Sequence, residues 1–227
     1  MAKKREPLRT VNGVTYERIP VKTHILLAGE DIAEIVDRYT RDLHQPGDIV
    51  VVAESPTAIT QGRAIPEKDI HIGLVARLMW RGVRKVSYGT GLRSPATFQC
   101  AVNECGAWRI VLAAVVGVLG KLAGRRGDFY RVAGMQAATI DAAHTSPVPP
   151  YDQCVILGPK DPAGVARRIR ERTGLEAAIM DINDIGGSWV LGHSGGLDAH
   201  HLEDVMRDNP AGQKAECTPI VLVRKKA

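Results

Sequence analysis

The chain has 227 residues, of which 44% are hydrophobic and 24% are charged, as in ordinary globular proteins. This length can bury one substantial core or two smaller ones, and aromatic residues, at 4%, are too sparse for a surface that stacks nucleic-acid bases. Of the net charge of +5, residues 1–9 carry +3 and residues 224–226 another +3, which leaves −1 for the body. We therefore expect solvated basic tails and no nucleic-acid partner.

The cysteines and the apolar runs bear on the cellular compartment. No two cysteines form a C-x-x-C pair, and four in a chain of this size are too few for a disulfide framework. We expect a protein of the reducing cytoplasm. The longest apolar run, residues 110–120, lies between Arg109 and Lys121 and is shorter than the roughly 18 residues of a membrane span. It is typical of a buried helix, so no membrane partner is expected, and no apolar signal segment follows the basic start.

The first third of the chain reads as strand, helix, strand. Residues 1–10 form the expected basic tail, and the body begins at residue 11. Alternating apolar residues predict a strand over 14–21, and helical spacing predicts a helix over 31–43. A nearly continuous β-branched run then predicts a strand over 48–54 that is buried on both faces.

The centre is expected to be rich in helices, and the last third to alternate strands with helices. The centre has helical patterns over 70–81, 94–105 and 108–122. Strand-like runs follow, and a helix capped by Asp161 and Pro162 stops at Gly174. A last helix over 199–207 leads to a strand over 218–224. The strand-like runs that precede this last helix cover residues 129–132, 137–140, 153–157 and 177–181.

This order of elements predicts a mixed α+β fold. We see no internal repeat and no clear linker. The body over 11–227 is therefore expected to be one domain or two packed subdomains, about 11–130 and 131–227.

Two aspartates each follow a β-type run, Asp141 and Asp181. Carboxylates at strand ends can converge on a divalent metal, which is the usual equipment of phosphoryl-group chemistry. Asn183 and Asp184 add oxygen donors, which suit magnesium or manganese better than zinc. The alternative, that both aspartates only cap helices or turns, stays open.

Two further polar segments could bind a ligand. Glycines at the end of the central helix are accompanied by cations that could bind a phosphate or carboxylate group. Alternatively, these cations only interact favourably with the negative end of the helix dipole. These cations are Lys121, Arg125, Arg126 and Arg131. The turn over 208–218 presents Gly212 and Gln213 to a ligand, unless it is only a connector.

The segment Gly192–Gly196 satisfies the nucleophile-elbow pattern Gly-x-Ser-x-Gly around Ser194. A serine hydrolase would also need an acid and a histidine downstream. The downstream histidines, His200 and His201, lie on the next helix, too close to fold back on Ser194. The position of these histidines therefore makes a serine hydrolase at Ser194 an unfavoured alternative.

Taken in order, several short motifs make the chain resemble the coenzyme F420-0:γ-glutamyl ligase family. The resemblance covers residues 18–63 and 132–224. It rests on residues 29–35, Pro46–Val52, Gln61–Arg63, Thr139–Ala143, Gly158–Pro162, Asp181–Asn183, Gly212–Gln213 and Thr218–Arg224.

The resemblance implies a mixed-sheet ligase-like fold, a homodimer and an amide ligase. Such ligases use GTP to activate a carboxylate as an acyl phosphate, which the amine of L-glutamate attacks. ATP is the alternative nucleotide, and Mg²⁺ or Mn²⁺ is implied. By this resemblance Asp141, Asp181 and Gln213 contact metal. The nucleotide is held near Glu54, Ser55, His144 and the turn Ala211–Thr218, which includes Gly212 and Gln213.

The chain departs from the family pattern at several positions. Ile59 aligns with a nucleotide-contacting lysine, and His144 replaces an asparagine. Residues 180–185 replace a Thr-Asp-Thr-x-Gly-Arg motif, and the stretch between Asp184 and Gly212 is shorter. Two alternatives therefore remain: glutamylation of another acceptor such as a folate, and a non-catalytic protein that binds metal or nucleotide.

Overall fold

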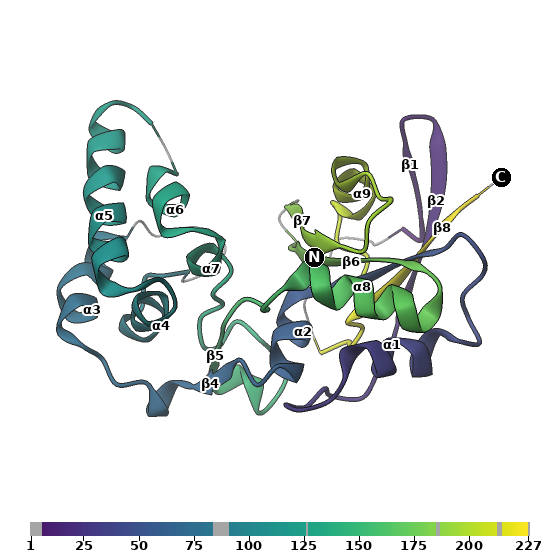
Figure 1. The fold of residues 1–227 in the computed structure, drawn as a ribbon, viewed down its shortest axis with the longest axis horizontal. Coiled ribbons are helices and arrows are strands. Elements are labelled where there is room, and N and C mark those ends of the chain that lie inside the picture. The colour runs from purple at the N-terminus through teal and green to yellow at the C-terminus, as the bar shows by residue number, and fades with distance from the viewer. Residues whose placement is uncertain (1–5, 84–90, 126, 185–186, 213–214, 227) are drawn as a thin grey trace. The chain divides into compact units, whose positions relative to one another are not determined.

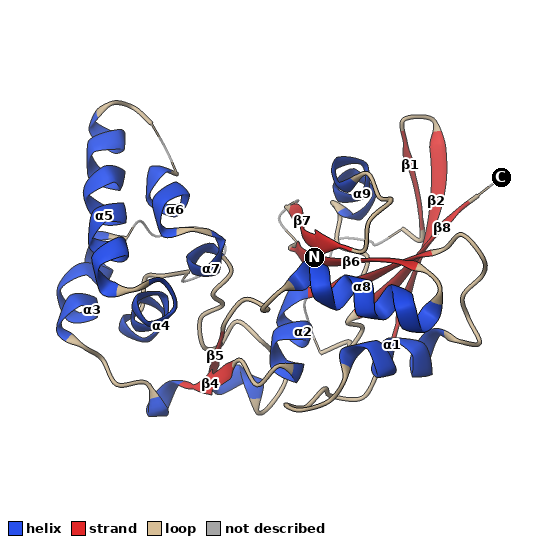
Figure 2. Cartoon of the chain, viewed as in Figure 1, coloured by secondary structure: helices blue, strands red, loops and turns tan. Residues whose placement is uncertain are grey.

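A computed structural model describes residues 6–83, 91–125, 127–184, 187–212 and 215–226. The chain forms two compact units: a sheet unit of residues 1–62 and 159–227, and a helical unit of residues 63–158. Helices and strands both contribute substantially, which confirms the α+β class (Figures 1 and 2). The expected division near residue 130 falls within a helix of the helical unit, because the last third of the chain returns to the sheet of the first third.

The sheet unit is built on one six-stranded mixed sheet. Its strand order is β1-β2-β8-β3-β6-β7. β3 and β6 are parallel neighbours, and the other pairs are antiparallel. The strands are β1 (Leu8–Val11), β2 (Val14–Val21), β3 (Ile49–Ala53), β6 (Glu176–Ile182), β7 (Ser188–His193) and β8 (Ile220–Lys225).

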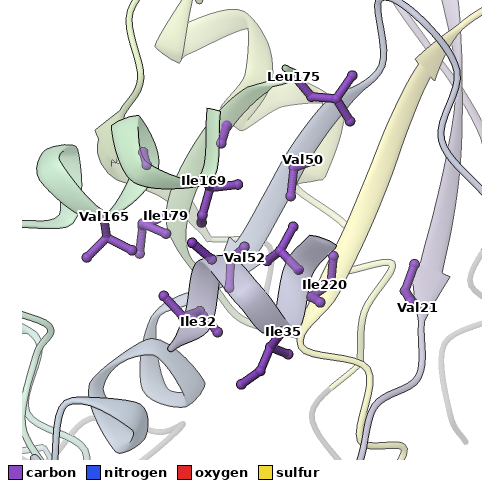
Figure 3. Close-up of a cluster of buried hydrophobic side chains, with 14 of the residues drawn as sticks. Val21, Ile32, Ile35, Val50, Val52, Val165, Ile169, Leu175, Ile179 and Ile220 are labelled. Carbon is purple, nitrogen blue, oxygen red and sulfur yellow. The ribbon is translucent and has the colours of Figure 1, made fainter. Parts of the chain in front are cut away.

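Helices cover both faces of this sheet. Alternate residues of β3, β6 and β8 pack against α1 (Ile32–Thr40) and α8 (Pro162–Thr173), as Figure 3 shows for Val52 and Ile179. The intervening residues of the same strands pack with α9 (Ala199–Met206) in a second cluster. This double coverage explains the continuous apolar runs of the central strands. The short helix α2 (Glu54–Thr60) follows β3 directly.

Local capping chemistry determines the helix ends predicted from the sequence. The Asp31 side chain accepts a hydrogen bond from Ala33 N at the start of α1. Asp161 caps α8 in the same way, Pro162 is its first residue, and Gly174 ends it in the left-handed conformation. The predicted start and end of α8 are confirmed, because each cap satisfies an otherwise unpaired backbone group. The helix predicted over 31–43 ends earlier, at Thr40.

The expected basic tails are partly strands. Residues 8–11 form β1, where Arg9 lies 3.2 Å from Asp208, and Arg224 in β8 pairs with buried Asp48 at 2.8 Å. The net charge of the chain differs between the two units rather than between the chain ends and the body. The sheet unit has 18 Lys and Arg against 19 Asp and Glu, a net of −1. The helical unit has 12 against 6, a net of +6.

The helical unit packs its helices around a separate core with one small sheet. Strands β4 (Ala64–Pro66) and β5 (Cys154–Ile156) pair antiparallel. The helices are α3 (Leu74–Met79), α4 (Pro95–Cys105), α5 (Ala107–Leu122), α6 (Asp128–Ala133) and α7 (Met135–Ala138). Single 3-10 turns cover Glu67–Asp69, Trp80–Gly82 and Tyr151–Gln153.

Three sequence predictions fail in this unit. The expected strands over 129–132 and 137–140 lie in the helical segments α6 and α7, where residues such as Phe129 face the neighbouring helix α5 rather than a sheet. Tertiary packing thus overrides their strand-like composition. The expected buried helix, α5, buries Ile110, Ala113 and Gly120 but exposes a row of large apolar side chains.

No single helix among the described residues is long and apolar enough to cross a bilayer. Helices α4 and α5 satisfy the length and composition criteria only when taken together, and they are bent by 113° with respect to each other.

Close packing of α5 on α6 depends on two glycines. A Cβ atom on Gly120 would lie 2.1 Å from the Asp128 carboxylate, and one on Gly117 would lie 3.1 Å from Phe129 Cβ. Asp128 is buried at the first turn of α6, where a negative charge is favourable. The glycines therefore allow α6 to approach the backbone of α5.

All four cysteines are free thiols, which agrees with the absence of a disulfide framework. Burial, with the nearby charge of Glu104, raises the pKa of the Cys100 thiol to about 11. Because the thiolate is the reactive form, Cys100 is an inert core residue.

Candidate functional site

The carboxyl ends of β3 and β6 meet at one edge of the sheet. In this parallel pair Ala53 lies opposite Met180. Glu54, the first residue of α2, and Asp181, the next residue of β6, each follow that last pair by one position. Glu54 is buried and Asp181 is half-buried. Ligand sites of open sheets gather at such edges. We call this pair, Glu54 and Asp181, the carboxylate edge.

Helix α2 carries the first member of this edge. Glu54 is its first residue, where a carboxylate interacts favourably with the helix dipole, and Ser55 follows in the same turn. Ile59, one turn further on, is only 7% exposed. Its side chain therefore belongs to the protein interior, which accounts for the absence of a charged residue at this position.

Asn183 and Asp184, the next two predicted metal ligands, lie at the turn between β6 and β7. Asn183 N donates to Gly187 O, and Asn183 Oδ1 accepts from Gly187 N, both at 2.9 Å. Asp184 Oδ1 accepts a 2.7 Å hydrogen bond from Asn209 Nδ2. Asn183 and Asp184 thus have structural hydrogen bonds at the end of β6, beside Asp181.

The turn before β8 reaches the same edge. Ala53 N donates to Pro219 O at 2.8 Å, so the end of this turn adjoins the residue before Glu54. Thr218 Oγ1 donates to Ala211 O at 2.5 Å, and Asn209 Oδ1 accepts from Gly212 N at 3.0 Å. The described residues on the two sides of this segment, 209–212 and 218–219, are thus held by hydrogen bonds. Gln213 lies outside the described residues.

An ion pair holds the base of this turn. Arg18, which is 1% exposed, donates to both carboxylate oxygens of Asp208, with one contact of 3.0 Å. Burial alone would raise the pKa of Asp208, but the hydrogen bond and charge of Arg18, with backbone and Arg9 contributions, hold it below its usual value. Asp208 therefore stays ionised and anchors the turn.

Asp141 belongs to the helical unit, whereas Asp181 belongs to the sheet unit. Asp141 exchanges two backbone hydrogen bonds with Ile156 of β5, at 2.8 and 3.1 Å. It follows α7 and Thr139, not the predicted strand. This bridge nevertheless fixes the backbone of Asp141 beside the small sheet.

His144 lies in the loop after Asp141. It is a non-glycine residue in the left-handed region, with φ of 69°, and its backbone N donates to Asp152 O at 2.8 Å. Its side chain is exposed, and Nε2 lies 3.9 Å from Glu67 Oε2. His144 is thus available to solvent and can contact a ligand from this loop.

Two of the four predicted phosphate-binding cations pair with one carboxylate. Arg131 Nη1 lies 2.6 Å from Asp128 Oδ1, and Arg125 Nε lies 3.2 Å from Asp128 Oδ2. Both guanidinium groups are largely exposed. This arrangement favours the structural alternative for Arg125 and Arg131. Lys121 is an exposed residue in the last turn of α5, and Arg126 lies outside the described residues.

Ser194 has a structural environment. Its Oγ donates to Glu176 Oε2 at 2.5 Å and accepts from Ala177 N at 2.9 Å. Among the described residues no histidine is hydrogen-bonded to this hydroxyl, and the neighbouring His193 Nδ1 accepts from Gly195 N at 3.3 Å. The hydroxyl therefore stabilises the start of β6 and lacks the base that a nucleophilic serine requires.

The donor chemistry of the carboxylate edge fits a hard divalent cation. Within the described part of the chain, no three His, Cys, Asp or Glu side chains are grouped to hold a metal ion. Magnesium commonly uses only one or two carboxylates and takes its other ligands from substrate phosphates and water. Glu54 and Asp181 satisfy that smaller requirement.

Sequence reasoning did not single out Asn209 as a site residue. It is 1% exposed, has φ of 53°, and joins Asp184 to the Gly212 turn through its side chain. The signal available was the Asn209-Pro210 pair, since asparagine tolerates the left-handed conformation and bonds its own backbone in turns. Its long-range partner, Asp184, could not be inferred from local sequence.

Comparison with known proteins agrees with the motif order. The family model of the F420-0:Gamma-glutamyl ligase matches residues 20–195, about three-quarters of the chain. This span includes Glu54, Asp141 and Asp181, and the turn before β8 lies beyond it. A search of curated proteins finds no match. The chain belongs to the F420-0:γ-glutamyl ligase family.

Proposed function

We propose that this protein is an amide ligase that joins the amine of L-glutamate to a carboxylate-bearing acceptor such as coenzyme F420-0. GTP is the proposed phosphoryl donor, with ATP as the alternative. Membership of the ligase family supports the reaction class. The observation that carries the proposal is the parallel pairing of Ala53 with Met180, because Glu54 and Asp181 directly follow these two residues.

In this proposal Asp181 and Glu54 hold Mg²⁺ or Mn²⁺. When bound, such an ion neutralises the charge of phosphate oxygens during phosphoryl transfer. Their carboxylate oxygens are suitable ligands, and the hydrogen bond from Asn209 to Asp184 orients the adjoining segment. Asp141 and Gln213 are proposed as further metal contacts on the resemblance alone.

The nucleotide is proposed to lie along the turn Ala211–Thr218, with Ser55 and His144 as additional contacts. The turn supports this role because it is tied to β3 through Pro219 and to Asp184 through Asn209. Fixing the two ends of a binding segment in this way lowers the entropy cost of binding a ligand.

The reaction balances in two steps. The acceptor carboxylate attacks the γ-phosphorus, which breaks the bond to the nucleoside diphosphate and forms an acyl phosphate. The glutamate amine then attacks the acyl carbon, phosphate leaves, and the amine proton passes to solvent or a base. The exposed cations Lys121, Arg125 and Arg131 are proposed to attract the anionic acceptor, although Arg125 and Arg131 also pair with Asp128.

Mass spectrometry of the product tests this proposal. Coenzyme F420-0, glutamate, Mn²⁺ and GTP or ATP should yield a product heavier by one glutamyl residue. Asp181→Asn should lower the rate by about 100-fold or more, the order of loss when one electrostatic contact is removed from an active site. The control Asp42→Asn changes an exposed carboxyl group of the same unit and should keep the wild-type rate. Full activity of Asp181→Asn would remove its proposed role.

The buried Ile59 favours one alternative, a protein that binds metal or nucleotide without ligase activity. Thermal-shift measurements with Mn²⁺ plus GTP, ATP or neither, combined with the product assay, separate this alternative from the ligase. A nucleotide-dependent shift without product from F420-0 or a folate would favour the alternative. The absence of any nucleotide-dependent shift would contradict the ligase proposal and the nucleotide-binding alternative together.

The homodimer implied by the family resemblance is also a proposal. Light scattering after size-exclusion chromatography should give twice the chain mass of 24.6 kDa. A monomer at micromolar concentration would contradict it.

A further inference from the structure

Helix α5 exposes a continuous apolar face. Leu122 is 81% exposed and Trp108 is 73% exposed, although large apolar side chains usually find cover. The opposite side of the helix is packed, since Ile110 and Ala113 are fully buried. The face consists of residues at helical spacing: Trp108, Val111, Leu112, Val115, Val118, Leu119 and Leu122. We call these seven residues the α5 face.

The surroundings of the α5 face are cationic. From residue 106 to residue 127 the sequence contains no Asp or Glu. Arg109 lies at the start of the helix and Lys121 in its last turn, and Arg125, which pairs with Asp128, follows it. The whole helical unit carries a net +6, against −1 for the sheet unit. A partner for this face should therefore be apolar beneath and negatively charged around its edge.

Helix α3 of the same unit has a similar composition. Leu74 and Leu78, one turn apart, are each 72% exposed, and Arg77 and Arg81 accompany them. Exposed leucines with arginines and without acidic residues thus occur on two helices of the cationic unit. In the sheet unit, the exposed Ile25, Leu27 and Leu43 lie in loops rather than on a helix.

We propose that the α5 face docks onto an anionic lipid surface, with the helix lying in the membrane interface. Sixteen residues of α-helix span about 24 Å, less than the roughly 30 Å hydrocarbon core, so the helix lies on the bilayer rather than crossing it. Aliphatic side chains enter the acyl boundary, Trp108 takes the interfacial position that tryptophan favours, and lysine and arginine meet the lipid phosphates.

Charge favours lipid over a second copy of this chain. Arg109 and Lys121 lie at opposite ends of α5, so pairing with α5 of another copy, in either direction, sets cations against cations. The carboxylate that packs on this helix, Asp128, is buried and already paired with Arg125 and Arg131. An anionic bilayer neutralises both ends together. The sequence argument against a membrane partner required the run 110–120 to be buried, and the exposure of α5 removes that condition.

Co-sedimentation of the full chain with vesicles tests this proposal. Phosphatidylcholine vesicles containing one-fifth phosphatidylserine should pellet the protein, pure phosphatidylcholine should pellet far less, and higher salt should weaken binding. The double variant Leu119→Gln, Leu122→Gln should reduce the vesicle affinity by about tenfold or more, because both side chains leave water on docking. Lys121→Glu should reduce it by about fivefold or more.

Matched controls lie in the sheet unit. Leu43→Gln changes a leucine that is about half exposed, and Lys22→Glu makes the same charge change on an exposed lysine. Both should bind vesicles like the wild type. Circular dichroism should show that all variants keep the native fold, since every changed residue is exposed.

Three results would overturn the proposal. The first is no binding to anionic vesicles. The second is binding that the α5 variants leave unchanged, which would assign it to the basic chain ends. The third is a dimer, seen by light scattering, that the double variant dissociates, because the α5 face would then be the contact between copies.

Discussion

The sheet unit and the helical unit treat their apolar surface in opposite ways. In the sheet unit, β3, β6 and β8 are covered on both faces, and Val50, Val52 and Ile179 are fully buried. In the helical unit, the longest helix, α5, leaves all seven side chains of the α5 face at least 40% exposed. Apolar composition alone therefore does not indicate burial, and whether a second layer covers the element decides the outcome.

The units also differ in where their charges are used. The sheet unit places carboxylates at the ends of two parallel strands, and a buried ion pair, Arg18–Asp208, anchors the turn beside them. The helical unit accumulates cations on exposed helices. This contrast leads to our assignment of chemistry to one edge of the sheet and of lipid docking to a helix surface.

A pair of apolar truncations tests the contrast in burial. Ile179→Ala should lower the free energy of unfolding by about 2–5 kcal/mol, since it leaves a cavity in a closed core. Leu119→Ala should change it by less than about 0.5 kcal/mol, because this side chain is mostly exposed. Urea unfolding followed by circular dichroism measures both. Equal losses would mean that α5 is covered in solution.

The ion pair at the base of the turn gives a smaller, pH-dependent effect. Asp208→Asn should cost about 1.5–3 kcal/mol at neutral pH, the range for hydrogen bonds to charged groups. Because Arg18 lowers the pKa of Asp208 in the folded state, the wild-type advantage should be complete above its ordinary value of 3.8 and should disappear as the pH falls through the lower folded value.

Unfolding measured from neutral to strongly acidic pH checks this sign. The exposed pair Asp204–Arg207 supplies the control, Asp204→Asn, with an expected change below about 1 kcal/mol. An Asp208→Asn variant that loses as much relative stability in acid as at neutral pH would contradict the assigned pKa direction.

Substitutions that test the close packing of α6 on α5 should change the free energy of unfolding by a similar or smaller amount. Gly120→Ala places a Cβ against the buried Asp128 and should cost about 1–3 kcal/mol, as overpacking does. The matched change Gly82→Ala has open space around it and should be neutral within about 1 kcal/mol. If both variants were neutral, α6 would not pack closely on α5.

Much of the sheet unit was predictable from sequence because its signals are local. Alternation identified β2 over its full length, and Asp161, Pro162 and Gly174 marked both ends of α8. The sequence predicts neither β7, which ends in the Gly-x-Ser-x-Gly pattern, nor β1, which lies in a basic segment. Both are edge strands, whose composition is less apolar than that of central strands.

The helical unit was less predictable because tertiary contacts decide it. Aromatic and β-branched residues at 129–132 suggested a strand, yet Gly127 and the close contact with Gly117 place them on a helix. The start of the turn before β8 is held by Asn209, whose partner Asp184 is 25 residues away. Contacts at such separations leave no periodic pattern in the sequence.

The central claim is that the carboxylate edge serves acyl-phosphate chemistry, and oxygen transfer tests it most directly. The acceptor is labelled with ¹⁸O in its carboxylate and incubated with nucleotide, Mn²⁺ and glutamate. Wild-type protein should release phosphate carrying one ¹⁸O for each amide formed, and Asp181→Asn should release none above background. Amide formation with unlabelled phosphate, or labelled phosphate from Asp181→Asn at the wild-type rate, would contradict the account.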